Sequence, residues 1–440
     1  MSRIEVVPNA GRMVRSLRDM GYEFTQAVAD IIDNSIAARA KKVEIEIRFN
    51  GDESWVRIVD DGEGMTPAVL REAMRYGSAR AYGRNDLGKF GLGLKTASMS
   101  QCQRLTVATR PGKNRARISG YSWDLDHIEK TNRWEILPLG NGADSKPARE
   151  PLKKSTGTVV LWQRLDRILG YKLPYGEFAK KKLATMCREV EEHLAMVFHR
   201  FLADDVRGKR LRIFVNGNKV IPWDPFCRAE EWTQRMDPIT LPLEHEGIKS
   251  EITLEPYILP KETQFSSPEA FRSAGRKNWN QQQGFYIYRA NRMIQSGGWS
   301  RLRTPDEHVK LARIALDFST DLDEAFKINV AKMSTQLPSQ IREDVKRHVA
   351  VIAKAAKNTY DTRTQPGSQT ARGTNTKTDG KYGKSKAPKG GSADRAAGRG
   401  TGPLIEERLT ISEWTNRLMA VAKRKERRIL KAVLDRIQAK

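Results

Sequence analysis

The chain has 440 residues, of which 39% are hydrophobic and 30% charged, and its 78 Lys and Arg against 53 Asp and Glu give a formal net charge of +25. This length predicts two or three domains rather than one compact domain. No run of about 20 apolar residues is present, which excludes a membrane-spanning protein. The basic excess favours a polyanionic partner, because surplus Lys and Arg are most often neutralised by phosphates.

The start of the sequence and its cysteines bear on the cellular compartment. The first 17 residues lack the apolar stretch and the small-residue cleavage site of a secretory signal. Cys102, Cys187 and Cys227 are odd in number and widely scattered, so they predict neither a disulfide framework nor a zinc module. We therefore expect a protein of a reducing cytoplasm, in the prokaryotic cytosol or nucleoid, that does not associate with a membrane.

Helix-like and strand-like segments alternate in the first part of the chain. A helix is expected over residues 25–40, and strands at 43–49 and 54–60 alternate in polarity and form a hairpin. Two further strands are expected at 104–110 and 156–165. Together these elements predict an α+β domain from residue 1 to a boundary near 170 (residues 1–170).

A second α+β domain is predicted for residues 171–358. It begins with a long helix at 180–202 and continues with strands at 211–220 and 284–294. A last helix is expected over residues 339–356. Strands that are first paired locally and then separated by a long helix favour two domains over one.

The composition changes in the last 80 residues, which carry +11 of the net +25. Residues 359–403 are rich in Gly, Ser, Thr and Lys and almost lack aliphatic residues, so burial cannot offset the entropy of ordering. A flexible basic linker is predicted there. Residues 404–440 place apolar residues near helical spacing around a basic cluster at 423–428, which predicts a basic amphipathic helical segment. This helix either docks on the rest of the protein or contacts nucleic acid.

Three short motifs in the first domain point to chemistry. In the first, Asp30 and Asn34 lie four residues apart in the expected helix, so both project from one face while Ile31 and Ile32 turn towards the core. An amide oxygen suits Mg²⁺, and a carboxylate one turn away can deprotonate a water molecule. By themselves, the two residues also fit the solvated face of an ordinary helix.

The second motif, DDGEGM, follows the strand at 54–60 directly. A carboxylate at the strand end, Asp60, can accept a hydrogen bond from an adenine amino group. Gly62 and Gly64 let the backbone approach a base, and Met65 offers an adaptable apolar wall. The alternative is a plain Asp-Gly turn that leaves the strand.

The third motif places three glycines before a helix-like segment and reads Gly88-Lys89-Phe90-Gly91-Leu92-Gly93-Leu94-Lys95-Thr96. Glycine-rich backbone at a helix N-terminus binds anions, and the two lysines would reinforce such a site. Residues 83–89 also fit the first seven positions of a Walker A loop. The eighth is Phe90, which lacks the hydroxyl that binds magnesium, and no apolar strand leads into Gly83, so a P-loop is excluded.

The order and spacing of the three motifs resemble those of the GHKL ATPases, which include gyrase B subunits, MutL, the ninety-kilodalton heat-shock chaperones, MORC proteins and histidine kinases. The resemblance implies a Bergerat fold, in which helices cover a mixed or antiparallel sheet, and ATP and Mg²⁺ as cofactors. In such a site Asn34 holds Mg²⁺, Asp60 reads adenine, Thr158 belongs to a later Gly-Thr element that helps to bind adenine, and residues 66–90 form a mobile lid. The implied cofactor-binding residues are Asn34, Asp60, Gly62, Gly64, Met65, Gly88, Lys89, Phe90, Gly91, Leu92, Gly93, Leu94, Lys95 and Thr158.

The resemblance also assigns the general base to Asp30, with one departure from the family pattern. Members that hydrolyse ATP usually have Glu at this position, and aspartate is one methylene shorter. Because a misplacement of about 1 Å can cost on the order of a hundredfold in rate, we expect slow hydrolysis of ATP to ADP unless the helix lies closer to the phosphates. Histidine kinases fit less well, since they lack a carboxylate base and carry a histidine helix upstream.

In the ATPase branches the pocket is followed by a ribosomal-S5-like transducer domain, which sends a cation to the γ-phosphate. Lys332, in the loop-like segment 326–334, is the candidate catalytic lysine, and Lys327 is the alternative. The segments 213–226 and 284–294 are similar to transducer strands of MORC proteins. The chain therefore resembles MORC and prokaryotic MutL-like ATPases most within the family.

These features predict an ATP-gated clamp that forms a homodimer on ATP binding and holds DNA through nonspecific phosphate contacts of the basic tail. The resemblance adds a nuclease or helicase partner and a role in restriction or antiphage defence. One alternative is a chaperone-like ATPase with a protein client, which DNA stimulation of hydrolysis would distinguish from a clamp. Another is an ATP-binding regulatory subunit of a nuclease or helicase complex.

No metal-binding cluster of carboxylates or histidines is expected outside the nucleotide pocket. The six histidines are dispersed in the sequence. His193 and His199 are six residues apart, which does not place them on one helix face. They are expected to be packing or surface residues.

Overall fold

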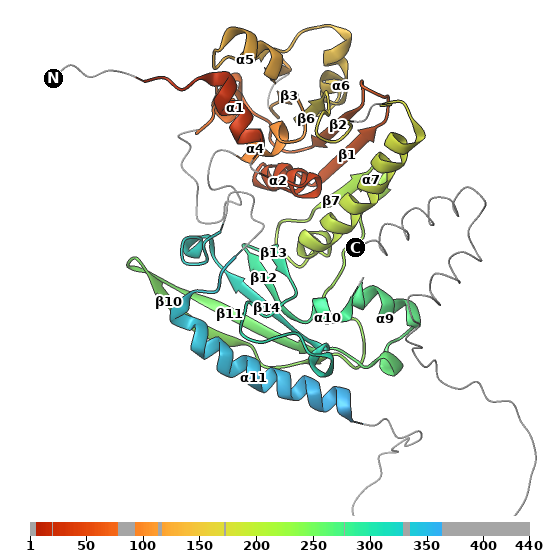
Figure 1. Cartoon of the computed structure of the whole chain (residues 1–440), viewed down its shortest axis with the longest axis vertical. Helices are drawn as coiled ribbons and strands as arrows, with labels where there is room; N and C mark the ends of the chain where they lie inside the picture. Colours follow the sequence, from red (N-terminus) through yellow and green to blue (C-terminus); the bar gives the residue numbers. More distant parts are fainter. Residues whose placement is uncertain are drawn as a thin grey trace, which may run out of the picture. The chain divides into compact units, whose positions relative to one another are not determined.

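A computed structural model describes residues 6–19, 21–77, 93–112, 117–170, 173–276, 278–328 and 335–362. Within these ranges, strands and helices form two sheets with helices packed against them (Figure 1). The α+β class is therefore confirmed. None of the described helices is long and apolar enough to cross a membrane. The helical segment at 404–440 and nearly all of the linker at 359–403 lie outside the described residues.

The first sheet has eight strands in the order β5-β4-β3-β6-β2-β1-β7-β8. Neighbouring strands are antiparallel except for β1 and β7, which are parallel. The strands are β1 (Lys42–Arg48), β2 (Trp55–Asp60), β3 (Arg104–Arg110), β4 (Ser119–Asp124), β5 (Leu137–Pro138), β6 (Gly157–Gln163), β7 (Arg212–Val215) and β8 (Asn218–Lys219). The four strands expected in the first part of the chain are confirmed, and β1 and β2 form the expected hairpin.

Side-chain alternation in β1 shows which face of the sheet packs on the main core, while Ala148 and Leu152 cover part of the opposite face at Ala108, Val159 and Leu161. In β1, Val43, Ile45 and Ile47 are buried in the core, whereas Glu44 lies exposed on the opposite face. The helices and turns of this part are α1 (Ala10–Arg18), α2 (Phe24–Ala37), α3 (Pro67–Met74), α4 (Gly93–Met99), α5 (Leu125–Thr131), η1 (Ala143–Ser145), α6 (Lys146–Arg149), η2 (Glu150–Lys153), α7 (Glu177–Val197) and α8 (His199–Leu202).

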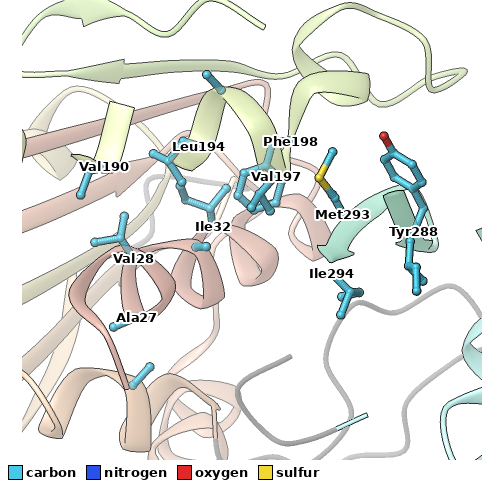
Figure 2. Packing of buried hydrophobic residues seen from close by; sticks show 14 of the residues in the cluster. Ala27, Val28, Ile32, Val190, Leu194, Val197, Phe198, Tyr288, Met293 and Ile294 are labelled. Atoms are coloured by element: carbon cyan, nitrogen blue, oxygen red, sulfur yellow. The ribbon is translucent and has the colours of Figure 1, made fainter. Parts of the chain in front are cut away.

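Helix α2 is apolar on most of its surface and is correspondingly buried. Figure 2 shows Val28 and Ile32 of α2 facing Val190 and Leu194 of α7. The helix expected at 25–40 is confirmed as far as Ala37, and the helix expected at 180–202 is confirmed as far as Val197. Helix α7 ends at Val197, because Phe198 leaves the helical conformation with φ −107° and ψ 17°, and the short α8 follows.

The second sheet has the order β10-β11-β14-β12-β13, with β9 paired to β11. Strands β12 and β14 are parallel and the other pairs antiparallel. Its strands are β9 (Gln234–Arg235), β10 (Ile239–His245), β11 (Ile248–Ile258), β12 (Gly284–Arg289), β13 (Arg292–Ser296) and β14 (Ala312–Phe318). The other elements are η3 (Glu262–Gln264), α9 (Pro268–Gly275), α10 (Trp279–Gln282), η4 (Glu307–Val309), η5 (Thr320–Leu322) and α11 (Ser339–Asp361), which packs along the sheet (Figure 1).

Two of the expected strands are hairpins instead. The segment 211–220 turns at Asn216 and Gly217 between β7 and β8, and 284–294 turns at Ala290 and Asn291 between β12 and β13. Asn216, Ala290 and Asn291 have positive φ (47°, 46° and 70°). The pair Asn216-Gly217 is a common hairpin-turn signal that the expected strand ran across, whereas residues 289–292 contain no Gly or Pro to mark a turn.

The first sheet extends beyond residue 170, where we expected the first domain to end, because β7 pairs with β1. Residues of both sheets also belong to one continuous hydrophobic core. The domain limits at 170 and 358 stay predictions, as does the S5-like character of the second sheet.

Candidate functional site

Helix α2 carries Asp30 and Asn34 one turn apart. The Asn34 side chain is exposed, and its Nδ2 donates to the Asp30 carbonyl oxygen at 3.2 Å. This bond uses the donor end of the amide and leaves its oxygen as the atom able to bind a cation. Asn34 is therefore exposed and offers an amide oxygen, which is the kind of ligand atom that Mg²⁺ needs.

Asp30 is buried, with 3% of its surface exposed, which excludes the solvated helix face considered from sequence. Its Oδ1 accepts from Nη2 of Arg292 at 3.2 Å, and its Oδ2 accepts from the hydroxyl of Tyr22 at 3.0 Å. The same Arg292 donates from Nε to Asp33 Oδ1 at 2.9 Å. Burial and the nearby Asp30 raise the pKa of Tyr22 well above its usual value, so its hydroxyl remains a donor.

Asp60 ends β2 and is 8% exposed. Its Oδ1 accepts from the backbone nitrogens of Gly62 (3.0 Å) and Thr158 (3.2 Å), and its Oδ2 accepts from the hydroxyl of Ser35 (3.1 Å). Burial raises the pKa of the Asp60 carboxyl to about 6, although these three bonds act in the opposite direction. A carboxylate held in this way is fixed in orientation and can still accept a further donor, because its two oxygens offer about four lone pairs.

Two glycines of the site are required by close backbone contacts. Gly64 has φ +68°, and a Cβ there would lie 2.4 Å from the carbonyl oxygen of Arg110. Gly157 has φ +126°, and a Cβ would lie 1.9 Å from the carbonyl oxygen of Asp60. The neighbouring backbone therefore leaves no room for a side chain at either position. This is a second reason for glycine here, beside the close approach of a base that the sequence suggested.

Three strands bring Thr158 and Met65 beside Asp60. In the sheet Thr158 is the register partner of both Asp60 and Thr109. The hydroxyl of Thr109 donates to the Gly157 carbonyl oxygen at 2.9 Å and accepts from the Met65 backbone nitrogen at 2.9 Å. Residues 60, 65 and 158 thus meet at one end of the sheet, as an adenine site requires.

The end of the third motif starts α4 next to α2. A Cβ built on Gly93 would lie 3.8 Å from Oδ2 of Asp30. Leu94 is half-buried, and Lys95 is buried, with its Nζ donating to the Ala73 carbonyl oxygen at 3.0 Å. Burial lowers the pKa of Lys95 to about 8. Residues Gly88, Lys89, Phe90, Gly91 and Leu92 lie outside the described residues.

The two candidate catalytic lysines lie near the end of the second sheet in sequence. Lys332 lies outside the described residues. Lys327 is exposed and has φ +49°. Which of them serves the γ-phosphate stays a prediction.

Residues 22–158 match the family model described as histidine kinase-, DNA gyrase B-, and HSP90-like ATPase. This part of the chain belongs to the GHKL ATPase family. The matched segment contains α2, β2, α4 and the first two residues of β6, and thus every described residue of the pocket except those from the second sheet. The first sheet, to which this segment contributes most strands, is mixed and largely antiparallel with covering helices, which agrees with the expected fold.

Individual relatives of the GHKL region are similar at low identity. The DNA mismatch repair protein MutL of Thermosipho melanesiensis is 28% identical over 136 residues, 29% of this chain and 24% of that protein. MutL of Thermosipho africanus is 26% identical over 142 residues, 30% of this chain and 24% of that protein. Protein MICRORCHIDIA 7 of Arabidopsis thaliana is 34% identical over 95 residues, 20% of this chain and 13% of that protein. The chain thus matches about a quarter or less of each relative, and the matches agree with a GHKL protein close to MutL and MORC.

Sequence reasoning did not find several residues of the GHKL pocket. Ser35 follows Asn34 directly, and Thr109 and Tyr22 lie in other segments, but no pattern distinguished them. Arg292 is one of 78 basic residues and lies 262 positions from Asp30. Only the folded chain shows that it contacts the expected general base.

The histidines and one unexpected cluster lie away from the GHKL pocket. His199 is buried and bonded through Nε2 to the Tyr288 hydroxyl at 2.7 Å, and burial lowers its pKa to about 3, so it is a packing residue as expected. From the sequence we expected no metal-binding cluster outside the pocket, and the structure adds one grouping to consider. Potential ligand atoms of His245, Glu246 and Glu324 lie within 4.8 Å of one another. Exposed acidic groups gather in this way without a metal, so no function follows from the cluster.

Proposed function

We propose that the chain binds ATP with Mg²⁺ in this pocket, hydrolyses it slowly, and uses it to close a dimeric clamp on DNA. The observation that supports the proposal most is that Asp60 bonds both Thr158 and Ser35, the residue that follows Asn34. Asp60, Asn34 and Thr158 come from β2, α2 and β6, and each has the chemistry that the family site needs.

The residues present fit the nucleotide. Asp60 offers a fixed, buried acceptor to an adenine amino group, and Met65 offers an apolar surface beside it. Asn34 would hold Mg²⁺ through its amide oxygen. Bound Mg²⁺ would offset phosphate charge, which supports hydrolysis in a water-poor site.

Asp30 is the candidate general base of the reaction. Its carboxylate lies within reach of the start of α4, where the phosphate-binding motif ends. In this position it can accept a proton from a water molecule that attacks the γ-phosphate. The shorter side chain relative to glutamate supports a low rate.

The proposal of a clamp with DNA as its substrate is supported by the relatives and by the positive charge of the tail. Two of the relatives are DNA mismatch repair proteins by name, and the tail of this chain carries much of the net charge of +25. Phosphate contacts from such a tail would bind DNA without reading its sequence. A nuclease or helicase partner, as in restriction or antiphage defence, extends the proposal on family resemblance alone.

Size measurement with different nucleotides tests the proposal. The full chain is analysed by chromatography with light scattering, with Mg²⁺ and either ADP or a non-hydrolysable ATP analogue, in the presence and absence of plasmid DNA. We expect a dimer only with the analogue, and in Asp60→Asn we expect the dimer only at higher concentrations of the analogue. A dimer that is indifferent to nucleotide would refute the clamp.

Hydrolysis rates separate the remaining possibilities. ATP turnover that rises with DNA supports the clamp on DNA. Turnover that ignores DNA but rises with an unfolded protein client supports the chaperone-like alternative. A chain that binds the analogue without measurable turnover supports a regulatory subunit.

A further inference from the structure

A buried arginine from the second sheet enters the GHKL pocket. Arg292 is 3% exposed and is the first residue of β13. Its Nε and Nη2 reach Asp33 Oδ1 at 2.9 Å and Asp30 Oδ1 at 3.2 Å. The candidate general base is thus in direct contact with a residue outside the segment that matches the GHKL family model.

The geometry of this contact suits a planar guanidinium. Asp30 and Asp33 lie three residues apart on α2 and therefore on the same face. One arginine fork can span both carboxylates, whereas the single ammonium group of a lysine cannot reproduce two donors in a fixed plane. Buried carboxylates need such a partner, because an isolated buried charge is strongly unfavourable.

Tyr22 holds the Asp30 carboxylate from the other side. Its hydroxyl donates to Oδ2 at 3.0 Å, while Arg292 donates to Oδ1. With a donor on each oxygen, rotation of the carboxylate plane is restricted. A general base must hold a lone pair at a defined point, so a fixed orientation of the Asp30 carboxylate favours proton abstraction.

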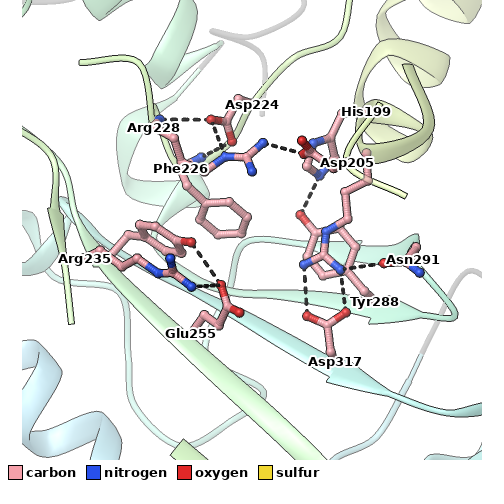
Figure 3. A network of polar contacts seen from close by, with 12 residues as sticks. His199, Asp205, Asp224, Phe226, Arg228, Arg235, Glu255, Tyr288, Asn291 and Asp317 are labelled. Carbon is pink, nitrogen blue, oxygen red and sulfur yellow. Dashed lines mark hydrogen bonds and ion pairs between the residues drawn. The ribbon is translucent and has the colours of Figure 1, made fainter. Parts of the chain in front are cut away.

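The position of Arg292 is fixed by the packing of its hairpin. The preceding residue, Asn291, accepts from Nη1 of Arg200 at 3.3 Å, and Arg200 also donates from Nη2 to Asp317 of β14 at 2.9 Å (Figure 3). The following residue, Met293, lies beside Phe198 at the end of α7 (Figure 2). These contacts tie the backbone of Arg292 to the β12–β13 hairpin, so its Cα moves with the hairpin.

We propose that Arg292 is a positioning residue for ATP hydrolysis, which orients the Asp30 carboxylate and makes its orientation depend on the place of the β12–β13 hairpin. The role rests on the proposed function, since it presupposes that Asp30 is the base. A movement of the hairpin would change the hydrolysis rate without any change in the residues that bind adenine. The second sheet thus acts on the chemistry through Arg292, separately from any lysine that reaches the γ-phosphate.

The test compares Arg292→Lys with the wild type in the full chain. The variant keeps a positive charge but cannot span Asp30 and Asp33. We expect kcat to fall about tenfold to a hundredfold, in line with the effect of a small misplacement of a reacting group. The affinity for a non-hydrolysable ATP analogue should stay within about threefold, because Asp60 and Asn34 are untouched.

Arg289→Lys is the matched control. Arg289 lies in the same hairpin, is equally buried, and makes a bidentate ion pair with Asp323 at 2.6 and 2.8 Å instead of contacting α2. It should lose thermal stability to a similar extent as Arg292→Lys but keep kcat within about threefold. An equal fall of kcat in both variants would show a general effect of damage to the hairpin and overturn the proposal.

A second variant covers the case in which Arg292→Lys does not fold. Asp33→Asn removes one charged partner of Arg292 and leaves Asp30 and Arg292 in place, so kcat should fall severalfold at unchanged affinity. Unchanged kcat in either folded variant would refute the role of Arg292. Absence of turnover in the wild type would refute the proposed hydrolysis, and this role with it, whereas loss of analogue affinity in Arg292→Lys would refute the positioning role alone.

Discussion

Replacement of Asp60 by asparagine should have opposite effects on nucleotide binding and on stability. The substitution keeps the shape of the side chain. Its Oδ1 can still accept from the backbone nitrogens of Gly62 and Thr158. The hydroxyl of Ser35, which donates to the carboxylate in the wild type, can rotate and accept from the new amide instead. The fold around the site should therefore persist.

Nucleotide binding should weaken, because the amide places a donor where the carboxylate has an acceptor. A hydrogen bond to a charged group contributes about 1.5 to 3 kcal/mol. This corresponds to a loss of about tenfold to a hundredfold in affinity for an ATP analogue. For the same reason, binding to the wild type should weaken as the pH falls below about 6, where Asp60 becomes protonated.

Stability should change in the other direction. The folded-state pKa of Asp60 is raised from 3.8 to about 6 by burial. Because the pKa is raised, the contribution of this group to the free energy of unfolding is fully favourable at pH values below its unfolded-state pKa. That contribution is lost as the pH rises through about 6. The ionised side chain then costs about 3 kcal/mol at pH 8, as an order of magnitude. Asp60→Asn removes this cost, so its melting temperature at pH 8 should equal or exceed that of the wild type, and the advantage should disappear near pH 4.

Calorimetric titration with the analogue and thermal unfolding at pH 8 and pH 4 measure both effects. Asp61→Asn is the control, since the exposed Asp61 caps the backbone nitrogens of Lys41 and Lys42 and lies outside the expected adenine site. Wild-type affinity in Asp60→Asn would refute the adenine assignment. A large loss of stability at pH 8 would refute the view that burial of the charge is costly there.

Three further predictions concern the base, a glycine and the tail. Asp30→Asn should bind the analogue within about threefold of the wild type and lose turnover by at least about a hundredfold; unchanged hydrolysis would show that Asp30 is not the base. Gly157→Ala should lower the free energy of unfolding, measured in urea, by about 1 to 3 kcal/mol or more, because its Cβ would lie 1.9 Å from the Asp60 carbonyl oxygen. Gly142→Ala is the control: its Cβ would meet no atom within 4 Å, so the free energy of unfolding should change little. Truncation after residue 362 should weaken DNA binding and flatten its dependence on salt by about 0.9 in log–log slope per lost phosphate contact; full affinity in the truncated chain would place the DNA site elsewhere.

The local elements of the pocket were predictable because their signals are short in range. Helix α2 and strand β2 follow from periodicity within a few residues, and Asp60 stands at the point where the alternating pattern ends. The chemistry of Asp60 and Asn34 follows from residue type and position. The turn at Asn216-Gly217 could have been predicted, because Asn-Gly is a common hairpin-turn pair, whereas the turn at Ala290 and Asn291 has no Gly or Pro to mark it.

The sequence by itself determined the GHKL family of residues 22–158, the α+β class, and the candidate adenine, metal and base residues, because each depends on local pattern and spacing. Only the tertiary structure decided that Asp30 is buried between Tyr22 and Arg292, and that β7 extends the first sheet beyond residue 170. These contacts join residues more than a hundred positions apart, or residues whose types occur throughout the chain. The packing of the shared core decides which distant groups are in contact, and local patterns in the sequence do not reveal these contacts.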